Sequence, residues 1–157
     1  MPDEQPPRVS GDERTVLTTL LAYQRASLLR KVDGVDDALA TTSPVPSGTS
    51  LLWLVNHVAD AEATWVLRRF AGQDDGHDAA FGPHEPTLAG ACARYRSTCA
   101  ATDLVIAQSS FDELCRAADR DPVPDLRWVV GHLLEETARH AGHADILREL
   151  LDGATGR

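Results

Sequence analysis

The sequence is poor in the features that mark several large classes of protein. Its 157 residues contain only three cysteines, Cys92, Cys99 and Cys115, at spacings that fit no metal motif. We interpret this odd number as reduced thiols rather than as a disulfide framework. No apolar run approaches the roughly 20 residues that cross a bilayer core. The acidic start MPDEQPPRVSGDE lacks the basic and apolar regions of a secretory signal, so we expect a cytoplasmic protein without membrane spans.

Basic charge and the common catalytic motifs are scarce as well. Fifteen basic residues stand against 24 acidic ones, and the formal net charge is −9. Such a field repels a phosphate backbone, so we expect no nucleic-acid partner. The chain has no G-x-S-x-G turn, no P-loop, no G-x-G-x-x-G and no H-E-x-x-H. This argues against serine hydrolases of that type, common nucleotide-binding folds and zincin proteases.

Helical periodicity dominates the remaining sequence. Apolar residues recur at three- and four-residue steps in four stretches, and none alternates in the way of a strand. The predicted helices span about residues 12–31, 49–71, 86–108 and 126–151, with a short helical turn at 35–39. The predicted N-caps are Ser10, with Glu13 completing a capping box, then Thr49 or Ser50, and Asp125. We expect an all-α four-helix bundle as a single domain over residues 11–157, preceded by a flexible segment at residues 1–10.

The most informative stretch is the last predicted helix, RWVVGHLLEETARHAGHADILRELL. At about 100° of rotation per residue, four ionisable side chains share one sector of this helix, and apolar residues lie at its edges. Burial of a carboxylate and several imidazoles among apolar side chains is costly unless their polarity is compensated, and a metal ion compensates it directly. The four side chains are those of His132, Glu136, His140 and His143.

A metal site of two imidazoles and one carboxylate is one interpretation of this sector. Glu136 and His140 lie four residues apart, a rise of about 6 Å, so both side chains can converge on one ion. His57 lies on or beside the apolar stripe of the second predicted helix and offers a third ligand. The alternative is that His57 is a hydrogen-bonded core histidine and that Glu136 and His140 form an ordinary helix pair. The spacing alone leaves both interpretations open.

Five further residues are candidates for the surroundings of such a site. Glu62, His132 or His143 would serve as a general base near the open positions of an ion. Arg25 and Arg148, on the inner sides of the first and last helices, would bind an anionic substrate. The alternative for both arginines is an interhelical or surface salt bridge.

Two segments, SGTSLLWLVNHVADAEATWV and LRWVVGHLLEETARHAGHADILRELLDGATG, resemble the DinB superfamily in its DUF664 (mini-circle protein) branch. The resemblance extends from about Gly11 to Gly156. It implies a four-helix bundle with up-down-down-up topology, often dimeric. It also implies a metal site that matches His57 and His140, with Glu136 at a position where many members carry histidine and where relatives of mycothiol-dependent maleylpyruvate isomerase carry glutamate.

The resemblance implies a reaction class for the protein. Members with known activity use low-molecular-weight thiols such as mycothiol, bacillithiol or glutathione. We therefore expect a divalent metal, zinc or nickel, and a thiol S-transferase or isomerase acting on a small-molecule thiol and an electrophile, in a homodimer. Two alternatives stay open: a metal-dependent hydrolase, in which the ion activates water, and a non-catalytic metal-binding protein of a stress response.

Overall fold

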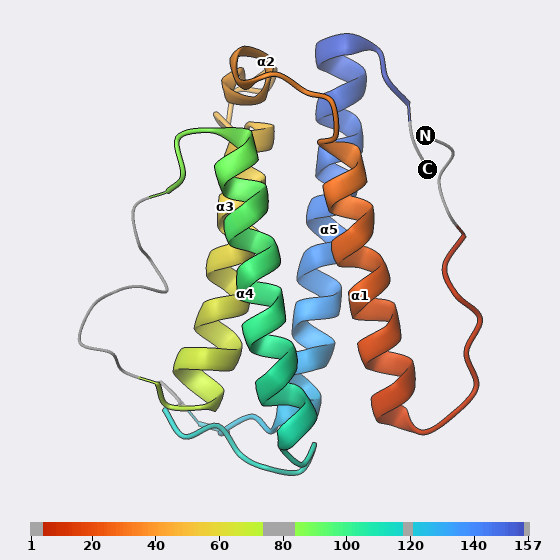
Figure 1. Ribbon diagram of the computed structural model, residues 1–157, viewed down its shortest axis with the longest axis vertical. Coiled ribbons are helices and arrows are strands. Elements are labelled where there is room, and N and C mark those ends of the chain that lie inside the picture. The colour runs from red at the N-terminus through yellow and green to blue at the C-terminus, as the bar shows by residue number, and fades with distance from the viewer. Residues whose placement is uncertain (1–4, 74–83, 118–120, 156–157) are drawn as a thin grey trace.

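The computed structural model describes residues 5–73, 84–117 and 121–155, and four long helical rods dominate these ranges (Figure 1). Within them the regular structure is helical, apart from one isolated bridge between Leu114 and Asp125. None of the helices in the described ranges is long and apolar enough to cross a membrane. The helices are α1 (Glu13–Lys31), a short α2 (Asp37–Thr41), α3 (Leu51–Glu62), its continuation η1 (Ala63–Phe70), α4 (Leu88–Gln108) and α5 (Leu126–Asp152).

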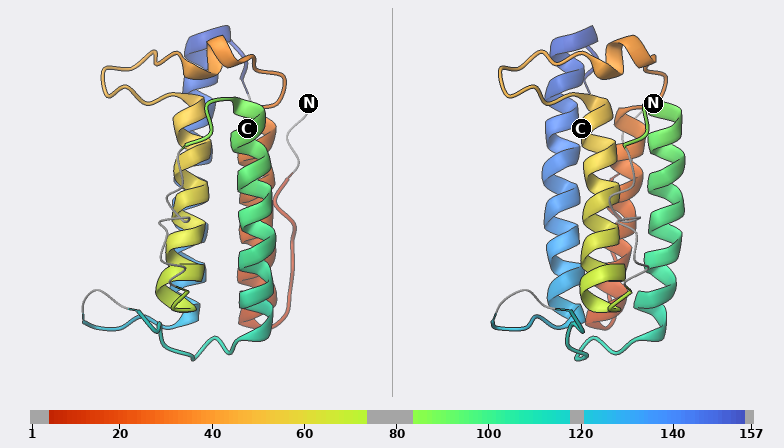
Figure 2. Two further views of the ribbon diagram at one scale, coloured as in Figure 1. Left: turned by 60° about the vertical axis from the view of Figure 1, so that its left-hand side comes forward. Right: turned by 90° about the vertical axis from the view of Figure 1, so that its left-hand side faces the viewer.

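The rods follow the predicted topology. In Figure 1, α1 rises, α3 and α4 both descend, and α5 rises again, which is the up-down-down-up order. Helix α1 packs along α5, α3 packs along α4, and α3 also contacts α5. Both views of Figure 2 show the four rods as one bundle, with the short α2 across its upper end. The prediction of an all-α four-helix bundle is confirmed.

Local capping explains where the helices begin and end. Ser50, Thr87 and Asp125 each accept a hydrogen bond from the backbone N–H three residues on, as N-caps do. Helix α5 ends at Gly153, whose φ of 73° is the left-handed conformation that glycine adopts without strain. The predicted cap of the first helix was wrong: Asp12, not Ser10, accepts from the Thr15 N–H.

The second long rod differs from the expected uniform helix. From Ala63 to Phe70 it is a π-helix, and at its end the Ala71 N–H donates to the Val66 carbonyl five residues back. The wider turn changes the direction of each side chain after Glu62, so the 3.6-residue period does not carry through. Trp65 and Arg69 therefore project from a segment of unusual geometry.

The core consists of two apolar clusters and a buried polar layer. One cluster includes Leu54, Val58 and Tyr95, and the other includes Leu21 and Leu126. The polar layer contains Arg25 of α1, Glu62 of α3 and Thr102 of α4, all buried. The short turn predicted at 35–39 lies two residues later, because Asp36 caps α2 through the Leu39 N–H. Residues 5–10 carry no regular structure and are exposed.

Candidate metal centre

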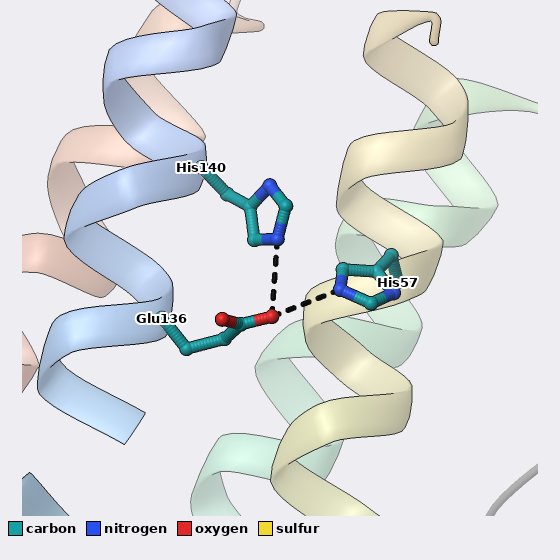
Figure 3. Close-up of side chains that lie close together, drawn as sticks. All are labelled: His57, Glu136 and His140. Carbon is teal, nitrogen blue, oxygen red and sulfur yellow. Dashed lines mark hydrogen bonds and ion pairs between the residues drawn. The ribbon is translucent and has the colours of Figure 1, made fainter. Parts of the chain in front are cut away.

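The imidazoles of two histidines, one on α3 and one on α5, converge on a single oxygen of the Glu136 carboxylate (Figure 3). His57 projects from α3, and Glu136 and His140 project from α5 toward it. Glu136 Oε1 lies 3.0 Å from His57 Nε2 and 3.1 Å from His140 Nε2. One ligand atom of each residue lies within 4.8 Å of the other two. The three residues named from the sequence are therefore brought together.

The helical geometry accounts for this convergence. Helices α3 and α5 run in opposite directions and contact each other, so one residue of α3 faces two successive turns of α5. The four-residue step stacks Glu136 and His140 on one face of α5. The cluster is recessed but open at one edge: the side chains of Glu136 and His140 are 16% and 10% exposed, whereas that of His57 is 33% exposed.

The electrostatics favour the charge states that a metal ion requires. Burial raises the pKa of Glu136, but the hydrogen bond from His57 and the charge of His140 outweigh burial and leave this pKa lowered. Burial lowers the pKa of His140, and the charge of Glu136 only partly opposes it. At neutral pH the cluster therefore holds an ionised carboxylate and a neutral His140, the forms in which these groups bind metals.

His143 contacts the cluster from one turn further along α5. Its Nδ1 lies 3.3 Å from Nδ1 of His140, so one of the two nitrogens donates and the other accepts. Without an ion, His140 donates from Nε2 to Glu136 and accepts at Nδ1. An ion on Nε2 requires the other tautomer, in which Nδ1–H donates to His143. His143 is thus placed to orient His140 and fix its tautomer, as hydrogen-bond partners of metal ligands do.

An indole that was not anticipated from the sequence covers His57. Trp53, one turn earlier on α3, stacks on the His57 ring with centroids 4.7 Å apart and planes within 8°. Its edge also faces His140, at 6.3 Å. The signal was present as a tryptophan four residues before the histidine, a spacing that brings two side chains together on a helix. Trp53 thus limits the motion of the more exposed imidazole.

The other candidate residues contact different partners. Arg25 and Glu62 form a bidentate pair, with Nε–Oε1 at 2.6 Å and Nη2–Oε2 at 2.7 Å. Arg148 donates to the Lys31 carbonyl at 2.6 Å and pairs with Asp152, and so joins the ends of α1 and α5. The structure places Arg25 and Arg148 in ion pairs and hydrogen bonds within and between helices, the alternative that the sequence left open, and it places Glu62 in the pair with Arg25. None of the described contacts of these three residues is with His57, Glu136 or His140.

His132 occupies the same sector of α5 as Glu136 but meets aromatic rings rather than ligands. Its ring stacks on Trp128, with centroids 5.0 Å apart and planes within 12°. Trp65 approaches it edge-on, with centroids 4.7 Å apart. Of the sequence candidates around the three central residues, His143 alone among the described contacts bonds to one of them.

The donor set fits a divalent transition metal. Two imidazole nitrogens and one carboxylate oxygen suit ions such as zinc and nickel, and three protein ligands leave coordination positions for an exogenous molecule. Both imidazole nitrogens face one carboxylate oxygen, and one ligand atom of each residue lies within 4.8 Å of the other two. The three side chains are therefore close enough together to hold one ion.

Comparisons with known proteins agree with this fold and cluster. A family model described as mycothiol-S-transferase matches residues 16–153, which include all three residues of the cluster. No curated protein matches the chain. Among solved structures, the crystal structure of a conserved protein from Enterococcus faecalis is similar to this chain, with a TM-score of 0.69 and 16% identity. That match covers 92% of this chain and 100% of the other, and it supports the fold alone.

Proposed function

Because this chain belongs to the mycothiol S-transferase family, we propose that it is a metal-dependent transferase of a low-molecular-weight thiol, with mycothiol as first candidate. Its second substrate is an electrophilic small molecule. The observation that carries the proposal is the convergence of His57, Glu136 and His140 on one point at a partly open surface. We propose zinc or nickel as the ion.

The roles of the residues follow from their geometry. A divalent ion held there would stabilise the thiolate form of a thiol at neutral pH. Glu136 supplies negative charge and fixes both imidazoles through one oxygen. His143 orients His140, and Trp53 restrains His57. In the overall transfer the thiol proton passes to solvent, sulfur bonds to the electrophilic carbon, and the electron pair leaves with the displaced group. No protein nucleophile is needed.

The pKa values of the protein's own cysteines support a reaction in which an external thiol is the nucleophile. Burial raises the pKa of Cys92, and it raises that of Cys99 to about 12, where the charge of Glu62 adds to the effect of burial. Thiols of this kind are protonated and poorly nucleophilic at neutral pH. An external thiol is therefore the better nucleophile for the proposed reaction.

Metal content gives the first test. We expect the purified protein to hold about one equivalent of metal and His140→Ala to lose most of it. The matched control is His84→Ala, because His84 also pairs with a carboxylate, Asp60 at 2.9 Å, but lies outside the cluster. Equal metal content in wild type and His140→Ala would contradict the site.

Thiol transfer gives the second test. Metal-loaded protein is incubated with monochlorobimane and mycothiol, bacillithiol or glutathione, and formation of the fluorescent thioether is followed. We expect a metal-dependent rate with at least one thiol, and its loss in Glu136→Ala. Bound metal without transfer from any thiol would favour a non-catalytic metal-binding protein. Activity that persists in Glu136→Ala and His140→Ala would reject the proposed mechanism.

A further inference from the structure

Beside the ligand cluster lies a group of aromatic rings that the metal site does not use. Trp65 from η1 and His132 and Trp128 from α5 form it, and we call these three residues the aromatic platform. Their ring centroids lie 4.7 to 5.1 Å apart. Trp128 covers one face of His132 yet remains 49% exposed. The platform thus presents an indole to solvent instead of burying it in the core.

Helical spacing places the platform next to the cluster. On α5, Trp128, His132, Glu136 and His140 follow one another at four-residue steps. His132 therefore lies one turn, about 6 Å along the axis, from Glu136. On the facing rod, Trp65 lies eight residues after His57, across the boundary between α3 and η1, and its ring contacts His132. A molecule on the platform would lie one to two helical turns from the candidate metal ligands, since Trp128 precedes Glu136 by eight residues.

The surroundings hold Trp65 in this orientation. It projects from the π-helical segment, and such departures from α-helical geometry are frequent at functional sites. The Arg69 guanidinium carbon lies 4.2 Å from the centre of the Trp65 ring system, in a cation–π contact. The opposing helix supplies Trp128 and His132 against the same indole. Contacts from two elements thus fix the platform.

The platform also offers a polar group. In residues 5–73, 84–117 and 121–155, no hydrogen bond is formed by the ring nitrogens of His132, whose contacts are the two indoles. A neutral imidazole carries one N–H donor and one acceptor. The site therefore combines electron-rich aromatic faces with a donor that no described residue uses.

We propose that the aromatic platform binds the planar, electron-poor ring of an aromatic electrophile, with a nitro or carbonyl oxygen accepting from His132. This inference rests on the proposed function and names the class of its second substrate. A carbon attacked by a thiolate is electron-poor by necessity, and the negative faces of indoles attract such rings. Trp65, Trp128 and His132 are positioning and specificity residues; they take no part in bond formation.

Binding is tested first, without any reaction. The probe is 1,3-dinitrobenzene, which has no leaving group, titrated into the metal-loaded full chain and followed by the indole N–H resonances in NMR. We expect Trp128→Leu to weaken binding about two- to tenfold, the range expected for one stacked aromatic pair. Leu150→Ala is the control, because Leu150 is also a large apolar side chain exposed on α5, at 58%, but lies 22 residues after Trp128 along the helix. Equal affinity in wild type and Trp128→Leu would overturn the proposal.

Selectivity between an aromatic and a non-aromatic electrophile is tested next, with one thiol used throughout. We expect Trp128→Leu to raise the KM for 1-chloro-2,4-dinitrobenzene about two- to tenfold and to leave the rate with iodoacetamide unchanged. If neither electrophile reacts but the probe binds through Trp128, the platform stands and the thiol transferase is rejected. If both react equally well in wild type and variant, the transferase stands and the platform is rejected. Conversion of a dimer to a monomer by Trp128→Leu would also overturn the proposal, because the face would then be a subunit interface.

Discussion

Replacement of Arg25 by leucine should destabilise the fold strongly and leave the proposed metal centre intact. Arg25 is buried, and its guanidinium contacts Glu62, Asp103 and Thr102. Burial lowers the pKa of Arg25, but the charge of Glu62 and their hydrogen bonds outweigh it and hold the pKa above its ordinary value. The charged form is thus strongly stabilised by its partners, so the contact is an internal ion pair rather than an open anion site.

The size of the stability loss follows from the charged group that stays buried when Arg25 is removed. Glu62 is 0% exposed, and without Arg25 its carboxylate keeps only the Thr102 hydroxyl at 3.0 Å among the described contacts. Loss of one partner of a buried pair costs about 3–5 kcal/mol. For a domain of this size each kcal/mol lowers Tm by about 2–4 °C. We expect Arg25→Leu to lower Tm by about 6–20 °C.

Replacement of Glu62 instead of Arg25 should lower the free energy of unfolding by less. In Glu62→Leu the guanidinium still pairs with Asp103 at 2.6 Å, a residue whose side chain is 60% exposed. The double variant Arg25→Leu/Glu62→Leu leaves no buried charge at this position, so we expect it to be more stable than Arg25→Leu alone. Urea denaturation measures the three free energies of unfolding, and elemental analysis should find unchanged metal. A double variant as unstable as the sum of the two single changes would refute this reasoning, as would loss of metal from folded Arg25→Leu.

Four further expectations follow from the same contacts. His143→Ala should weaken metal binding about 10- to 100-fold in a competition assay, while His132→Ala leaves it unchanged, because of these two histidines only His143 has a described hydrogen bond to a proposed ligand. Burial lowers the pKa of His140 below its ordinary 6.5, so the unfolded chain takes up this proton more readily; the free energy of unfolding of metal-free protein should fall as the pH drops below 6.5 in urea titrations at several pH values. Gly153→Ala should cost about 1 kcal/mol, or about 2–4 °C in Tm by calorimetry, because φ is 73° there. Sedimentation at micromolar concentration should show a dimer of the 17.0 kDa chain, and a monomer alone would exclude it.

The sequence predicts the helices well because their signals are local. A cap, an apolar stripe and a terminal glycine all lie within one element, and Asp125 and Gly153 bound α5 as expected. The predicted N-cap of α1 was wrong because Ser10 and Asp12 both offer a side-chain oxygen near the first apolar residues of the helix. The π-helix after Glu62 was not foreseen, since apolar residues at three- and four-residue steps indicate a helix without showing where its turns widen.

The sequence does not predict which residues of different helices contact each other. The periodicity placed His132, Glu136, His140 and His143 in one sector of α5, but the structure leaves His143 exposed, and the facing rod determines what each residue contacts. Glu136 and His140 meet His57, whereas His132, one turn away, meets Trp65. Arg25 finds its partners 37, 77 and 78 residues away in sequence. No helical period contains that information, because it depends on the register between rods.

That register also explains why one carboxylate of the bundle is suited to an added cation. Glu62 is neutralised by Arg25, Asp60 by Arg94, and Asp145 by Lys31, each through a cation that stays charged across the neutral range. Glu136 instead faces two imidazoles, and its contact with Arg139 is long, at 3.5 Å, to a guanidinium that is half exposed. A divalent ion at the first three carboxylates would have to displace a permanent ion pair. At Glu136 it would replace two hydrogen bonds from imidazoles whose nitrogens can themselves bind a metal, so an ion there would displace no permanently charged partner.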